Sequence, residues 1–263
     1  MTARAIWKGV LRLGQESVPV RMYSAAQDRD VHFHLLHDRD FTRVKQRIVN
    51  PETQQAVPHE EVRKGYPVAP DTFVLVKPED IARTEPPRSR DIELARFVPH
   101  AAVPAAWYQR PYYLGPDGGE EAYFALATAL RRRERVGIAH WVMRKKAYFG
   151  ALAAHGAYLA LIALHSEAEV VDTSLLEAPS GRELDSRELQ LAEQLVSALA
   201  GPFDPSAFHD EHRARVLSLI ERKARGEPVR PGRLKPPRRA APERLSRTLE
   251  ASLARVHKER RSA

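Results

Sequence analysis

Residues 92–98 read Ile-Glu-Leu-Ala-Arg-Phe-Val, a run that alternates apolar and polar side chains and stops at a proline. Period-two alternation predicts a β-strand with one face buried. Upstream of this run, Thr72–Val76 favours a second strand, closed by Lys77-Pro78, and Val31–Leu36 alternates in part. We therefore expect residues 3–100 to form mainly strands. Many short strands separated by turns are typical of a β-barrel or a β-sandwich.

Helical signals begin in the middle of the chain. Residues 120–135 have acids at the first positions, an apolar stripe and Arg131–Arg133 near the end, which is the charge order that a helix dipole favours. Val136–Met143 predicts a further strand. Tyr158–Leu164 could be a strand or part of a helix, because it is rich in Ala and Leu. The expected fold class is mixed, β-rich α+β.

Two more helices are predicted between residues 185 and 226. Asp185 and Glu188 form a capping-box pattern ahead of the first helix. Asp204-Pro205 supplies an N-cap and a first-turn proline for the second, and Gly226 ends it. We expect residues 1–226 to be the core of the protein, with residues 185–226 as its helical C-terminal part.

Residues 227–263 differ in composition from this core. Prolines alternate with basic residues up to Pro242, which predicts a flexible linker. A narrow apolar stripe then predicts a terminal helix that folds only on binding; it consists of Leu245, Leu249, Leu253 and Val256. The linker also supplies candidate DNA contacts, namely Arg230, Arg233, Lys235, Arg238 and Arg239. Truncation after Gly226 should leave a folded protein.

Charge is distributed unevenly along the chain. Residues 1–165 carry 24 Lys+Arg and 18 Asp+Glu, residues 166–226 carry 7 and 12, and residues 227–263 carry 11 and 4, for a net charge of +8. A basic body with a basic tail suits a polyanion, of which duplex DNA is the commonest. A solvated surface with an adhesive tail is the alternative that charge alone leaves open.

Composition excludes several classes of protein. The 263 residues include no Cys, so disulfides, thiol nucleophiles and Cys-ligated zinc are absent, and a reducing cytoplasm is expected. There is no G-x-S-x-G and no glycine-rich phosphate loop among the 13 Gly. We expect no signal peptide, and the longest apolar stretch, Ala151–Leu164, is too short to cross a membrane. Neither a catalytic residue nor a cofactor is predicted.

Histidines provide the most metal-like pattern, and the acids at positions 38, 40, 60 and 61 are interpreted as turn and surface residues. His209 and His212 lie three residues apart on a predicted helix and could face one ion. No third or fourth ligand can be placed from sequence, so an exposed acidic first turn is the favoured interpretation. His32, His34 and His37 are favoured as packing or surface residues, and no metal site is predicted.

Clusters of basic residues fit phosphate binding better. Arg43, Lys45 and Arg47 alternate and share one face if the segment is extended. Aromatic residues do not interleave with the clusters in the sequence, and no helix is rich in base-reading side chains. A phosphate-contacting, shape-reading DNA binder is therefore expected. Its candidate contacts are Lys8, Arg43, Lys45, Arg47, Arg83, Arg88, Arg90, Arg144, Lys145 and Lys146.

Short blocks in one order along residues 3–226 carry a family resemblance. They are Arg4–Gly9, Ser17–Ala25, Phe33–His37, Val62–Tyr66, Pro111–Pro116, Val136–Ala139, Glu188–Leu199 and Gly201–Pro205, followed by His209–Glu211. Together they resemble the bacterial Ku proteins of DNA end joining. Residues 165–171 depart from the family's pattern, and the tail is short and mostly Arg where many family tails are rich in Lys.

The resemblance implies a fold and a function. It implies a Ku-type β-barrel core with a dimerisation arm, and a homodimeric ring threaded by a double-stranded DNA end without reading sequence. It also implies a non-catalytic protein that supports double-strand break repair by non-homologous end joining and recruits a multifunctional ATP-dependent DNA ligase. A cytoplasmic, nucleoid-associated location follows.

Two other functions are weighed against this one. A chromatin-architectural protein would coat closed DNA, whereas a threaded ring needs an end. A metal-dependent nuclease would use His209, His212 and nearby acids. Neither explains the ordered blocks.

Overall fold

A computed structural model describes residues 3–178, 180–181, 183–227 and 245–262. The chain divides into two compact units. The first consists of Met1–Arg29 and His34–Leu175, and the second of Asp30–Phe33 and Leu176–Ala263. No helix in the described part of the chain is long and apolar enough to span a membrane.

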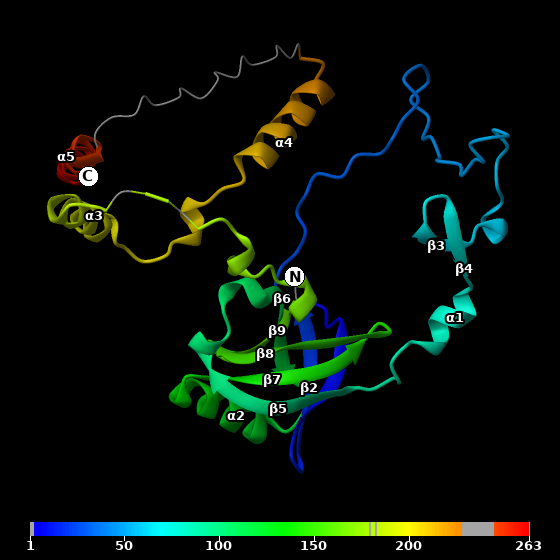
Figure 1. Cartoon of the computed structure of the whole chain (residues 1–263), viewed down its shortest axis with the longest axis horizontal. Helices are drawn as coiled ribbons and strands as arrows, with labels where there is room; N and C mark the ends of the chain where they lie inside the picture. The colour runs from blue at the N-terminus through cyan, green and yellow to red at the C-terminus, as the bar shows by residue number, and fades with distance from the viewer. Residues whose placement is uncertain (1–2, 179, 182, 228–244, 263) are drawn as a thin grey trace. The chain divides into compact units, whose positions relative to one another are not determined.

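The first unit is built on a closed barrel of seven strands, which confirms the β-rich α+β class and the barrel (Figure 1). Around the barrel the order is β1-β2-β6-β9-β8-β7-β5. The strands are β1 (Trp7–Leu13), β2 (Glu16–Ser24), β5 (Asp91–Pro99), β6 (Tyr108–Pro116), β7 (Arg135–Met143), β8 (Lys146–His155) and β9 (Tyr158–Leu164). All neighbours are antiparallel except β1 and β5, whose parallel pairing closes the barrel.

Alternating side chains fill the barrel, as the period of a strand requires. The residues that are at most 1% exposed include Leu11, Met22, Ile92, Leu114, Leu152 and Leu161. The predicted strands over residues 92–98 and 136–143 are confirmed, and residues 158–164 resolve to a strand. Leu94 and Arg96 flank a bulge in β5, which shifts the pairing register of this strand by one residue.

Helix α2 (Glu120–Arg133) packs against β7 and β8. Its Tyr123 is fully buried, and the hydroxyl donates to the carbonyl oxygen of Leu114 (2.5 Å) and accepts from the amide of Leu159 (2.7 Å). Burial raises the pKa of this phenol. The helix predicted over residues 120–135 is confirmed but ends at Arg133, because Glu134 adopts a left-handed conformation at φ 51°.

Residues 25–90 connect β2 to β5, and residues 34–90 of this connection, the arm segment, have little regular structure. They contain the hairpin β3 (Lys64–Ala69) and β4 (Thr72–Val76), followed by α1 (Pro78–Arg83). The strand predicted at residues 72–76 is confirmed. The strand predicted at Val31–Leu36 is wrong: only Leu36 forms a bridge, with Arg43, and the rest pairs with no strand in the part of the chain that the structure describes.

The second unit contains helices α3 (Ser186–Leu199), α4 (Glu211–Ala224) and α5 (Leu245–Ser262). The capping box before α3 is confirmed, since the Asp185 carboxylate accepts from the Glu188 amide at 2.8 Å. The start predicted for the next helix is wrong. Asp204 caps only a 3-10 turn, and α4 begins after Asp210, whose carboxylate accepts from the Arg213 amide at 2.8 Å. The remaining 3-10 turns are His59–Glu61, His100–Ala102, Ala105–Trp107, Glu167–Glu169 and Thr173–Leu175.

The helix predicted near the C-terminus is present as α5, and it packs against α3. Leu249, Leu253 and Val256 are half-buried, and Arg187 pairs with Glu250 at 2.8 Å. The boundary at Gly226 stays a prediction, as does folding of this helix on binding. The linker candidates at positions 230, 233, 235, 238 and 239 lie outside the described residues.

Candidate nucleic-acid interface

A tight turn joins β7 to β8 and presents two of the predicted cations. Arg144 and Lys145 form this two-residue connection, between the paired residues Met143 and Lys146. Both have positive φ, 49° and 66°, as a type I′ hairpin turn requires. Asn and Gly are the usual residues in such a turn, so Arg144 and Lys145 occupy a conformation that their type disfavours.

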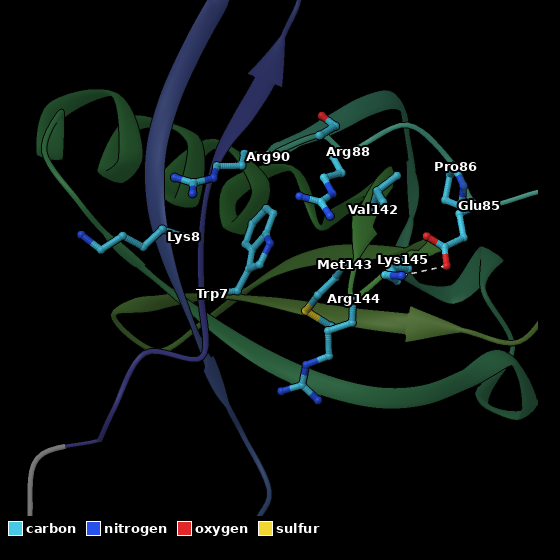
Figure 2. A pocket seen from close by; sticks show the side chains of 11 residues that line it. Trp7, Lys8, Glu85, Pro86, Arg88, Arg90, Val142, Met143, Arg144 and Lys145 are labelled. Carbon is cyan, nitrogen blue, oxygen red and sulfur yellow. Dashed lines mark hydrogen bonds and ion pairs between the residues drawn. The ribbon is translucent and has the colours of Figure 1, made fainter. Parts of the chain in front are cut away.

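A cavity of about 660 Å³ lies beside this turn and collects cations from three segments of the chain (Figure 2). Half of the ten predicted core candidates line it: Lys8, Arg88, Arg90, Arg144 and Lys145. The first comes from the start of β1, the next two precede β5, and the last two form the β7–β8 turn. The fold therefore brings together groups that are more than 130 positions apart at the extremes, such as Lys8 and Lys145.

Trp7 stands among these cations in Figure 2 and is backed by Gly9. A Cβ at Gly9 would overlap the indole carbons of Trp7 and the carbonyl oxygen of Arg90. Position 9 is consequently restricted to glycine by close packing. Trp7 itself packs against the barrel core, which fixes the wall of the cavity between Lys8 and Arg88.

The five cations differ in how they are neutralised. Lys8 Nζ lies 3.0 Å from a carboxylate oxygen of Asp117, and Lys145 Nζ lies 3.0 Å from one of Glu85. Within the described part of the chain, the other three have no carboxylate partner; they are Arg88, Arg90 and Arg144. Three guanidinium groups are thus free to contact an anion, and guanidinium groups bind phosphate bidentately.

Arg21 is a neighbouring cation that the sequence did not single out. It is directly opposite Lys8 in the β1–β2 pairing, and its Nε donates to Asp117 at 2.6 Å. Hydrogen bonds from Arg21 and then from Lys8 hold the pKa of Asp117 below its ordinary value of 3.8. The hydrogen bond to Asp117 in turn raises the pKa of Arg21. No run of basic residues surrounds Arg21, so only strand register could have revealed it.

The remaining candidates lie elsewhere. Lys146 lines a different cavity, on the other side of the turn. Arg83 is the last residue of α1, and its guanidinium group lies 4.0 Å from a carboxylate oxygen of Asp80. The alternating cations of the arm segment, Arg43, Lys45 and Arg47, are exposed. They do not lie on a regular strand, since only Arg43 forms an isolated bridge, with Leu36.

The histidines considered as metal ligands are placed as follows. Among the described residues no group of three or more His, Asp or Glu side chains could hold an ion. His209 precedes α4 and His212 lies inside it, so the helical i, i+3 placement predicted for this pair is wrong. His37 contacts Asp40 at 2.9 Å.

Comparison with known proteins gives one consistent result. Residues 12–191 match the family described as the Ku70/Ku80 beta-barrel domain. The Non-homologous end joining protein Ku of Anaeromyxobacter sp. (strain K) is 39% identical over 229 residues, 86% of this chain and 77% of that protein. Two proteins of Geotalea uraniireducens (strain Rf4) are similar over their full lengths: Non-homologous end joining protein Ku 2 at 35% identity over 97% of this chain, and Ku 1 at 30% over 99%.

Replacing Asp117 by Asn should strengthen binding to duplex DNA. The substitution releases Lys8 and Arg21, so one or two further phosphate contacts become available, each steepening the slope of log affinity against log salt by about 0.9. Fluorescence anisotropy of a labelled duplex over a salt series measures this slope. Because folding lowers the pKa of Asp117, its ion pairs are intact at neutral pH and are lost only as pH falls below about 3.8.

Asp91→Asn is the matched control, because it releases Arg12, which pairs with Asp91 at 3.2 Å and does not line the cavity, whereas Asp117→Asn releases Lys8, which does. It should leave the slope unchanged. Equal slopes for Asp117→Asn and the unmodified protein would show that Lys8 and Arg21 do not reach DNA.

Proposed function

Because this chain belongs to the Ku family, we propose that it binds the ends of double-stranded DNA without reading sequence and acts in double-strand break repair by non-homologous end joining. The observation that carries the proposal is the cavity beside the β7–β8 turn, where three of five cations have no carboxylate partner in the described chain. Contacts to phosphate position a protein on DNA but carry no sequence information.

The cavity suits a phosphate backbone by its shape as well as its charge. Its cations come from β1, from the segment before β5 and from the β7–β8 turn, so they surround a concave surface instead of following one helix face. Lys8 and Lys145 can exchange their carboxylate partners for phosphates, since surface ion pairs are weak. Glu85 and Asp117 would then limit the affinity and keep binding reversible.

We further propose that the protein acts as a homodimer that closes around the duplex, with the arm segment as the dimerisation element. Both faces of the β3–β4 hairpin are apolar and exposed: Tyr66 is 68%, Phe73 61%, Val74 51% and Leu75 69% exposed. An isolated two-stranded hairpin is marginally stable in water. A second copy of the chain is the covering partner that the proposed ring requires, through an isologous interface.

The partner and location inferred from the family complete the proposal. The protein is non-catalytic, works beside the nucleoid in the cytoplasm, and brings a multifunctional ATP-dependent DNA ligase to the bound end. These roles rest on membership of the Ku family. A chromatin-architectural protein is the second candidate, because the same cations would hold closed DNA equally well.

Replacing Arg88, Arg90 and Arg144 together by Gln should weaken duplex binding and flatten its salt dependence. If each guanidinium group contacts one phosphate, the slope of log affinity against log salt becomes less steep by about 2 to 3. The loss should be equal for duplexes of unrelated sequence, which anisotropy titrations of two such duplexes would measure.

A matched triple variant removes the same charge elsewhere. Arg132, Arg133 and Arg135 lie at the end of α2 and the start of β7, at the opposite end of that strand from Arg144. Their replacement by Gln should change the slope much less. An equal effect of both triple variants would mean that net charge, and not the cavity, determines affinity.

Leu75→Asp should convert the dimer to a monomer. Placing a carboxylate on the apolar face of the hairpin leaves an unpaired charge in the proposed interface, which costs several kcal/mol, on the order of 3 to 5. Sedimentation velocity at micromolar protein measures the mass. Tyr158→Asp, on an exposed side chain at the start of β9, is the control and should remain dimeric. A monomeric unmodified protein would refute the ring.

A further inference from the structure

The wall of the barrel has a notch where β9 ends before β8. Pairing between β8 and β9 begins at Gly150 opposite Ala163, so residues 146–149 of β8 are paired only with β7. The chain after β9 turns toward β6 instead, since the amide of His165 donates to the carbonyl oxygen of Trp107 at 2.8 Å. A cavity of about 690 Å³ fills this notch.

Cations and aromatic rings line the notch together, a combination that the linear sequence does not show. Its principal side chains are Arg110 and Tyr112 from β6, and Lys146, Tyr148 and Phe149 from β8. The Arg110 guanidinium carbon lies 6.0 Å from the centre of the Tyr112 ring. In the described chain neither Arg110 nor Lys146 has a carboxylate partner, so both charges are available.

Both rings from β8 are held in place by their register partners on β7. Tyr148 stacks on Trp141, with ring centres 5.5 Å apart and planes 14° apart. Phe149 lies against His140, with ring centres 6.4 Å apart. Rings fixed in this way lose little conformational entropy when a ligand stacks on them, which is the requirement for a preorganised stacking surface.

One carboxylate, Glu169, also lines the notch and is already occupied. It accepts from the amide of Ser166 at 2.8 Å and from its hydroxyl at 3.1 Å, and lies 3.5 Å from His165 Nδ1. These hydrogen bonds, first of all the one from the Ser166 amide, lower the pKa of Glu169. The negative charge of Glu169 is thus tied to the segment after β9, and the lining cations that remain available to an anion are Arg110 and Lys146.

We propose that this notch binds an unpaired nucleotide of a single-stranded overhang. Arg110 and Lys146 hold its phosphate, and the base packs against the ring of Tyr148 or Phe149. The unpaired backbone edge of residues 146–149 offers hydrogen-bonding groups to the base. Combined cations and aromatic rings are the chemistry that binds single strands without sequence preference.

The position of the notch connects it to duplex binding, and in this respect the inference rests on the proposed function. Residues 142–145 of the β7–β8 hairpin line the cavity beside the β7–β8 turn, and residues 146–149 line the notch. A duplex end held on one side of the turn would present its overhang to the other. The protein would then distinguish a blunt end from an end with unpaired bases.

The test compares one duplex with blunt ends, with four-nucleotide 3′ overhangs and with four-nucleotide 5′ overhangs, each bound to the full-length protein. We expect Arg110→Gln/Lys146→Gln to lower affinity for at least one overhang about fivefold to tenfold, in line with the loss of one stacked and phosphate-bound nucleotide. Blunt-end affinity should change less than twofold. Arg88→Gln is the control and should weaken all three duplexes equally.

A second readout reports on the base itself. The fluorescence of 2-aminopurine placed in the overhang should change when the protein binds. Phe149→Leu should abolish that change if the base stacks on the Phe149 ring. Tyr148→Leu should abolish it if the base stacks on the Tyr148 ring. Identical affinities for all three duplexes with no change in 2-aminopurine fluorescence would overturn the inference. So would an overhang preference that survives the double substitution.

A labelled tetranucleotide of thymidine separates this inference from the proposed function. If the unmodified protein fails to bind any duplex yet binds the tetranucleotide, and the double variant does not, the notch stands and the proposed function falls. If duplexes bind, but the tetranucleotide does not and overhangs add no affinity over blunt ends, the proposed function stands and the nucleotide site in the notch is refuted. The unpaired edge of β8 would then be a site for an extended peptide.

Discussion

Closure of the barrel by the parallel pairing of β1 with β5 is the constraint on which the rest of this structure depends. The pairing is short, with Val10, Leu11 and Arg12 opposite residues 91–93, and the amide of Val10 donates to the carbonyl oxygen of Arg90 at 2.9 Å. It fixes the start of β5, where the chain returns from the arm segment, against β1. A closed barrel also leaves no free sheet edge along most of its circumference. Two stretches depart from this: β5 pairs with β1 only at residues 91–93, and residues 146–149 of β8 have no partner on β9.

The same pairing assembles the cation-lined cavity. It sets Lys8 near Arg90, while the β5–β7 register brings the β7–β8 turn to the same region. Like charges gathered in one concavity repel each other, and the fold offsets part of this repulsion by giving Lys8 and Lys145 carboxylate partners. The remaining repulsion among the arginines favours an anionic ligand. Stability and binding are therefore in opposition here, as is usual at functional surfaces.

Local sequence patterns predicted the elements whose signals are local. The alternation at residues 92–98, the charge order of α2 and the capping box at Asp185 each act within a few residues, and each is confirmed. Val31–Leu36 failed because a strand needs a partner, and the partner is set by the whole fold. Strand β8 (Lys146–His155) was not predicted, since its Ala-rich half packs on both faces and shows no alternation.

The sequence could predict only those residues of the candidate site that belong to clusters of basic residues along the chain. Lys8, Arg88 and Arg144 were named from charge, but their convergence follows from strand register. Arg21 and Arg110 stand alone in the sequence; Arg21 could be found only from its neighbour across the sheet, and Arg110 only from the cavity that it lines. Lys145 and Lys146 are adjacent in the chain yet line different cavities, because the turn ends between them.

The most direct test of the central claim is a competition between linear and covalently closed circular duplex DNA of one sequence and mass. Binding of the unmodified protein to a labelled linear duplex is measured while either unlabelled DNA is added. If the protein takes duplex ends, linear DNA displaces the label and closed circles do not, and linearising the circle with one cut restores competition. Equal competition by both forms would contradict the account and identify a protein that coats DNA along its length.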